Sequence, residues 1–94
     1  MNQNCLHLVL KHKWFEKIAS GEKNSEYREC KAYWNNRFQA VVNGKKTMWD
    51  FVIFHDGYTN RIIKRKLVGI NITRNKNDLN LPEVWELKLG DIIS

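Results

Sequence analysis

Hydrophobic positions near the N-terminus follow a strand-like pattern and then a helix-like pattern. Residues 5–10, CLHLVL, are mostly apolar and predict a first strand. Residues 11–20 predict a short amphipathic helix. The apolar residues Trp14, Phe15, Ile18 and Ala19 recur at helical spacing, and lysines and a glutamate occupy the other side. Gly21 stands where a helix-ending glycine is expected, since glycine adopts the left-handed conformation at little cost.

The next segment alternates polar and larger side chains. Residues 23–30, KNSEYREC, predict a second strand with Glu26 and Arg28 on one face and Ser25 and Tyr27 on the other. Residues 31–38, KAYWNNRF, predict a second short helix or a turn. An Asn-Gly dipeptide at 43–44 is a strong turn signal.

The second half of the chain contains the clearest strand patterns. Residues 49–55, WDFVIFH, predict a strand that a turn at Asp56-Gly57 closes. Residues 61–73 predict a long strand that leaves the core at its charged end, with one face formed by Lys64, Lys66, Val68, Ile70 and Ile72. A polar loop and a last strand, 84–93, follow. Four or five strands with two short helices indicate an α+β or small barrel-like fold.

Length and composition fit one small domain with a polar surface. The 94 residues leave room for a single core, so one domain spanning 1–94 is expected, and the 43% hydrophobic content argues against disorder. No apolar run is long enough for a signal peptide core or a membrane span. Cys5 and Cys30 can pair, but intracellular thiols usually stay reduced. We therefore expect a cytoplasmic monomer that does not bind membranes.

The charge balance indicates which classes of partner to consider. Sixteen Lys and Arg residues against ten Asp and Glu residues give a net charge of +6. Such an excess attracts polyanions, so nucleic acid, an anionic membrane surface and an acidic protein are candidates. A chain that is merely basic is the alternative, and nothing in the sequence specifically indicates a protein partner.

The most charged short segment combines a glycine with three ionic side chains in the pattern Gly21-x-Lys23-x-x-Glu26-x-Arg28. Lys23 and Arg28 can bind a phosphate or a carbonyl group, and Glu26 can accept hydrogen bonds from base N–H groups. Glu26 can instead orient Arg28, and an exposed strand with weak surface ion pairs remains an alternative.

This G-x-K-x-x-E-x-R pattern resembles the signature of the ASCH domain, a family of the PUA-like superfamily, and specifically its small bacterial or phage-type single-domain members. All four motif positions are matched, and looser similarity extends to LVLKHKWFEKIASGEK, WDFVIFHDGYT and ELKLGDII. The resemblance implies a PUA-like small β-barrel of about five strands with two short helices. It also implies a cleft that binds RNA or a nucleobase, with Lys23, Glu26 and Arg28 as its floor.

The resemblance leaves two functions to compare. We expect an RNA- or nucleotide-binding module whose ligand is RNA, a nucleotide or a modified nucleoside. The alternative is a small hydrolase that acts on a modified nucleobase, as acylcytidine amidohydrolases do, or on an RNA phosphodiester. In that case Lys23 and Glu26 would handle protons and Arg28 would stabilise an anion. The hydrolases have a threonine nucleophile where this chain has Glu26, so binding without catalysis is the leading hypothesis.

Aromatic and basic residues outside the motif extend the possible ligand surface. Four aromatic residues could stack on a base, namely Trp14, Tyr33, Trp34 and Tyr58. Trp34 is preferred among them because polar residues follow it in the sequence. Aromatic residues are also needed in the core, where we expect Trp49, Phe51 and Trp85. Arg61 and Lys64 belong to the densest of three basic segments, at 11–17, 45–46 and 61–66. These segments either form a track for phosphates or remain scattered, solvated charge.

The histidines and cysteines show no metal-binding spacing. Cys5-x-His7 is too short for a structural zinc site, and the chain has no CxxC motif, so no metal and no cofactor are expected. His12 can act as an acid or base, but a solvent-facing histidine at a helix start is the simpler interpretation.

Overall fold

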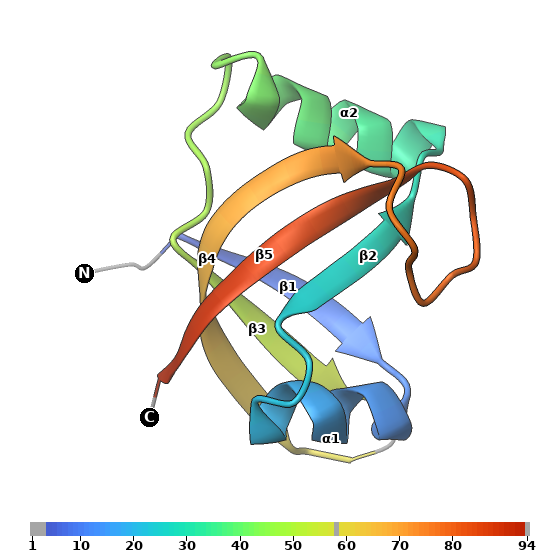
Figure 1. Ribbon diagram of the computed structural model, residues 1–94. Coiled ribbons are helices and arrows are strands. Elements are labelled where there is room, and N and C mark those ends of the chain that lie inside the picture. The colour runs from blue at the N-terminus through green and yellow to red at the C-terminus, as the bar shows by residue number, and fades with distance from the viewer. Residues whose placement is uncertain (1–3, 58, 94) are drawn as a thin grey trace. The chain divides into compact units, whose positions relative to one another are not determined.

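The computed structural model describes residues 4–57 and 59–93, and within them the chain forms five strands and two helices (Figure 1). In chain order these are β1 (Cys5–Leu10), α1 (His12–Ser20), β2 (Ser25–Glu29), α2 (Ala32–Val42), β3 (Phe51–Asp56), β4 (Ile62–Thr73) and β5 (Val84–Ile93). The expected fold class, α+β with about five strands and two short helices, is confirmed. Within the described residues, no helix has the length and apolar character that crossing a membrane requires.

The strands form one sheet in the order β1-β3-β4-β5-β2. β1 and β3 are parallel, with Cys5 opposite Phe51, so the chain makes a long crossover between them. β3 and β4 are antiparallel neighbours, and β2 is antiparallel to β5, where Glu26 lies opposite Leu87. This order separates β2 from β1 in the sheet although the two strands are close in sequence.

The chain divides into two compact units. Unit 1 contains the residues up to Asn24, Trp49–Val68 and the residues from Leu89 on. Unit 2 contains Ser25–Met48 and Gly69–Lys88, so β4 and β5 contribute residues to both units. The motif is divided as well: Gly21 and Lys23 belong to unit 1, and Glu26 and Arg28 belong to unit 2.

The core of unit 1 follows the alternation of its strands. In β1 every second residue is buried, namely Leu6, Leu8 and Leu10, and in β3 the same alternation buries Val52 and Phe54. Helix α1 adds Phe15 and Ile18, which lie one turn apart on its apolar face. The strand and the helix predicted for residues 5–20 are therefore confirmed, with the helix starting at His12.

The core of unit 2 is aromatic. Phe38 of α2 and Trp85 of β5 are fully buried, and their ring centroids lie 5.4 Å apart in an edge-to-face arrangement. The Trp85 indole N–H donates to Asn35 Oδ1 at 2.8 Å, which connects α2 to β5 and satisfies the one polar atom of the indole. The prediction that Trp85 is a core residue is confirmed, whereas Trp49 and Phe51 are only partly buried.

Helix α2 is longer than the sequence pattern predicted. The predicted segment ended at residue 38, but the helix continues to Val42. The Asn-Gly dipeptide ends this helix: the Asn43 N–H donates to Gln39 O, and Gly44 has a φ of 77°. Glycine tolerates that left-handed conformation, so the turn signal marks a helix C-terminus.

Strand β4 buries residues in both its charged half and its apolar half. Val68 and Ile72 are 59% and 45% exposed, and the buried residues are Arg65, Leu67 and Thr73. The charged half of the strand therefore does not leave the core at Arg65, contrary to the prediction. The reason lies in the hydrogen bonds of its guanidinium group, described below.

Candidate functional site

Arg65 holds together the end of α1 and the first residues of the G-x-K-x-x-E-x-R motif. Its guanidinium is buried in unit 1 and donates to the carbonyl oxygens of Gly90 (3.0 and 2.7 Å), Lys23 (2.8 Å) and Ile18 (3.2 Å). It also donates to Asn24 Oδ1 at 2.7 Å. A guanidinium has five N–H donors in a rigid plane, so one side chain can hold several carbonyl groups together. Arg65 is therefore a structural cation and does not belong to a phosphate track.

Gly21 turns the chain so that Lys23 folds back onto helix α1. Gly21 has a φ of 84°, its N–H donates to Ile18 O, and the Lys23 N–H donates to Lys17 O at 3.0 Å. These two backbone bonds are typical of a helix that ends at a glycine, and the same two carbonyl groups also accept from Arg65 and from the Ser20 hydroxyl. The predicted helix-terminating role of Gly21 is confirmed.

This turn completes a surface that we call the lysine–Trp14 surface, formed by Lys13, Trp14, Lys17 and Lys23. The three lysine Nζ atoms lie 4.7, 5.4 and 4.6 Å from the centroid of the Trp14 ring, in the order Lys13, Lys17, Lys23. Each distance is within the range of a cation–π contact. Like charges that gather at one ring repel each other, so an anion bound there would lower their electrostatic energy.

Glu26 and Arg28 contact each other in unit 2. They lie on the same face of β2, as predicted, and Arg28 Nη2 donates to Glu26 Oε2 at 3.0 Å. Glu26 is buried, and its Oε1 accepts a hydrogen bond from the Tyr27 N–H at 3.1 Å. On the other face, the Ser25 hydroxyl donates to Glu86 at 2.8 Å. The buried Glu26 carboxylate therefore orients Arg28, which was the alternative to accepting hydrogen bonds from a base.

Arg28 extends from this carboxylate toward the aromatic residues of α2. Its guanidinium carbon lies 5.2 Å from the Trp34 ring centroid, and its side chain is 22% exposed. Its Nε is buried and has no hydrogen-bond partner within residues 4–57 and 59–93. The Nε atom is shielded from solvent, so a ligand would meet the exposed part of the guanidinium, and a guanidinium beside an aromatic ring is suited to binding a planar or anionic group.

Helix α2 adds the rest of what we call the arginine–aromatic surface, formed by Arg28, Tyr33, Trp34 and Arg37. Trp34 stacks on the buried Phe38 ring with centroids 5.4 Å apart and 15° between the planes, so the core holds its orientation. Tyr33 contacts Trp34 edge-on and is itself 58% exposed. Arg37 lies over both rings, at 5.6 and 5.9 Å, and donates to the Tyr33 hydroxyl at 3.1 Å.

The remaining predicted ligand residues have partners in unit 1. Arg61 forms an ion pair with Glu16 and lies 5.2 Å from the Phe15 ring centroid. The Lys64 ammonium lies 4.3 Å from the Phe51 ring centroid. Tyr58, a candidate for base stacking, lies outside the described residues.

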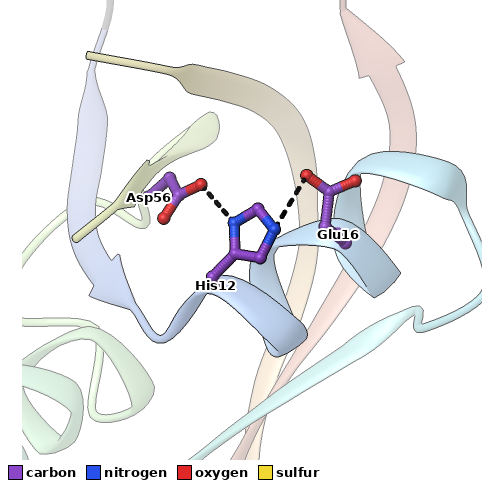
Figure 2. A group of neighbouring side chains, drawn as sticks. All are labelled: His12, Glu16 and Asp56. Carbon is purple, nitrogen blue, oxygen red and sulfur yellow. Dashed lines mark hydrogen bonds and ion pairs between the residues drawn. The ribbon is translucent and has the colours of Figure 1, made fainter. Parts of the chain in front are cut away.

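Sequence reasoning missed a cluster formed by His12, Glu16 and Asp56. Figure 2 shows the His12 ring between the two carboxylates, with Nδ1 2.7 Å from Asp56 Oδ2 and Nε2 3.8 Å from Glu16 Oε1. The spacing of His12 and Glu16, one helical turn apart, was a signal in the sequence. The contribution of Asp56 left no signal in the sequence, because Asp56 comes forty-four positions after His12 and reaches it through the pairing of β1 with β3. Lys11 and Gly57, the chain neighbours of this cluster, line a shallow hollow with Val9 and Leu10.

The two surfaces and the cluster differ in what they can bind. The two surfaces combine cations with aromatic rings, a combination suited to phosphates and bases, whereas the cluster presents nitrogen and carboxylate oxygen atoms. No protein-family model, no curated protein and no solved structure significantly matches this chain.

Proposed function

We propose that the chain is a binding module for single-stranded RNA or nucleotides. The observation that carries this proposal is the arginine–aromatic surface, where the half-exposed Tyr33 ring and the Trp34 ring lie beside the guanidinium groups of Arg28 and Arg37. Nucleobases stack on aromatic rings and guanidinium planes, and phosphates pair with arginine. The net charge of +6 and the lysine–Trp14 surface favour the same ligand class.

The contacts of Glu26 favour binding over hydrolysis. One carboxylate oxygen accepts from the Tyr27 N–H and the other from Arg28, so the group serves to hold the arginine in place. The resemblance of the G-x-K-x-x-E-x-R motif to ASCH domains supports the same proposal, and we propose membership of that family. In that view Glu26 positions Arg28, and Arg28 contacts the ligand.

The test is a fluorescence anisotropy titration of a labelled single-stranded oligoribonucleotide at low salt. We expect Tyr33→Ala to weaken binding by roughly 5- to 150-fold, because losing one base-stacking contact costs about 1–3 kcal/mol. Arg37→Gln should weaken binding as well, since it removes a cation that lies over both rings.

The matched control is Val42→Ala, which shortens another exposed side chain of α2, 52% exposed, without touching the arginine–aromatic surface. It should bind as the parent protein does. Absence of binding by the parent protein at low salt would refute the proposal. Equal affinities for Tyr33→Ala and Val42→Ala would show that the surface does not contact RNA. Circular dichroism of each variant checks that the fold is retained.

A further inference from the structure

The two nitrogens of the His12 ring have different neighbours. Nδ1 lies 2.7 Å from Asp56 Oδ2, and a carboxylate can only accept, so in the neutral ring the proton is on Nδ1. The lone pair of the neutral ring is then on Nε2, which lies 3.8 Å from Glu16 Oε1 (Figure 2). The cluster therefore directs one basic nitrogen and one carboxylate oxygen toward the same point at the surface of α1.

The burial of Asp56 is a second, independent observation. Its side chain is fully buried, and its Oδ1 has no hydrogen-bond partner among the described residues. A buried carboxylate that is not fully hydrogen-bonded is costly unless positive charge lies close to it. His12 is the group through which that charge can be supplied, either as a proton on the ring or as a metal ion on Nε2.

We propose that His12 Nε2 and Glu16 Oε1 bind a divalent transition-metal ion such as Zn²⁺ or Co²⁺. Bonds of about 2.0–2.2 Å from nitrogen and from carboxylate oxygen to zinc bridge atoms up to roughly 4 Å apart, which accommodates the observed separation. Imidazole together with a carboxylate favours such ions over Mg²⁺ and Ca²⁺, which prefer oxygen ligands alone. Asp56 does not touch the ion and positions His12, as outer-shell carboxylates do for metal-bound histidines.

Arg61 competes with the ion for Glu16. Its Nη1 pairs with the same Oε1 atom that faces His12. Lys11 and Lys13 flank His12 in the chain and add positive charge near the site. A metal ion must therefore displace Arg61 or share the Glu16 carboxylate with it, which lowers the affinity. The remaining coordination positions face solvent, because the His12 and Glu16 side chains are 59% and 46% exposed. This proposal does not depend on RNA binding.

The test uses the untagged protein with its histidine side chains observed by long-range ¹H–¹⁵N NMR during titration with Zn²⁺. We expect Nε2 of His12 to shift while Nδ1 keeps its proton. Calorimetry should give binding that His12→Ala abolishes and that Glu16→Gln weakens at least 10-fold. Arg61→Gln should strengthen binding, because it frees the Glu16 carboxylate. Asp56→Asn should weaken binding by roughly 10- to 100-fold, as expected for an outer-shell partner.

His7 and His55 supply the control, because their rings form a separate pair in which His7 Nδ1 lies 3.0 Å from His55 Nε2. His7→Ala should leave the His12 shift unchanged. A zinc-induced shift confined to His7 and His55, loss of the proton from Nδ1 of His12, or no shift of His12 would each overturn the proposal. Since Asp56→Asn can unfold the chain, the exposed substitutions Glu16→Gln and Arg61→Gln decide the outcome by their opposite effects.

Discussion

At the scale of single residues, Arg65 is buried although lysines stand on both sides of it in the sequence. Five hydrogen bonds to three carbonyl groups and one side-chain amide compensate for its removal from water. Burial lowers the pKa of the Arg65 guanidinium, against a smaller opposing effect of Asp91. Arginine titrates so far above neutrality that the group stays charged at physiological pH.

We expect Arg65→Met to lower the free energy of unfolding by about 3 kcal/mol or more, because it leaves buried carbonyl oxygens without donors. Chemical denaturation at pH 7 measures this change. Lys66→Met is the matched control, since Lys66 is the exposed neighbour on the same strand, and its effect should stay within about 0.5 kcal/mol. Similar losses for both variants would mean that the guanidinium contacts contribute little to stability.

Gly21 is a residue whose backbone conformation matters more than its contacts. A methyl group added there would meet nothing within 4 Å, but the φ of 84° disfavours any side chain. We therefore expect Gly21→Ala to cost about 1–2 kcal/mol of unfolding free energy through backbone strain alone. Thermal denaturation followed by circular dichroism provides the measurement.

Gly69→Ala is the control for this prediction, because Gly69 also has free space around its Cα and lacks a positive φ. It should be neutral or slightly stabilising, since alanine restricts the unfolded chain. A Gly21→Ala variant as stable as Gly69→Ala would refute the strain argument. Gly21→Ala should also weaken RNA binding if the turn that brings Lys23 to Trp14 is disturbed.

At the scale of secondary-structure elements, the hydrophobic pattern predicted most of the fold. It located β1, α1, β3 and β5 because each has a regular buried face, and β2 followed from the alternation of Glu26 and Arg28 with their neighbours, although Glu26 is its only buried residue. It misjudged the length of α2, because an Asn-Gly dipeptide signals a chain reversal without saying whether a strand or a helix precedes it. It also misjudged β4, since a charged run gives no indication of which residue finds carbonyl partners.

The candidate site was predictable only where its residues are close in sequence. The shared face of Glu26 and Arg28 follows from strand alternation, and the aromatic character of residues 33–34 is visible directly. Contacts between distant segments were not predictable: Asp56 reaches His12 through the pairing of β3 with β1, and Arg65 reaches Lys23 through a turn. Such contacts depend on which strands pair, and no short turn joins β1 to β3, because α1, β2 and α2 lie between them in the chain.

At the scale of the whole molecule, the net charge of +6 and the local surfaces make different predictions for binding. General attraction to a polyanion depends on total charge, whereas phosphate contacts depend on where the cations lie. Two pairs of lysines separate these effects. Lys13 and Lys17 contact the Trp14 ring, while Lys45 and Lys46 lie exposed in the loop after α2.

Replacing either pair by glutamine lowers the net charge by the same amount, from +6 to +4. If the lysine–Trp14 surface contacts phosphates, Lys13→Gln/Lys17→Gln should reduce the slope of log affinity against log salt by up to roughly 1.4, at about 0.7 per phosphate of a single strand. Lys45→Gln/Lys46→Gln should change that slope much less. Anisotropy titrations at several salt concentrations measure both slopes. Equal reductions would show that binding responds to total charge, and the lysine–Trp14 surface would then have no specific role in holding the strand.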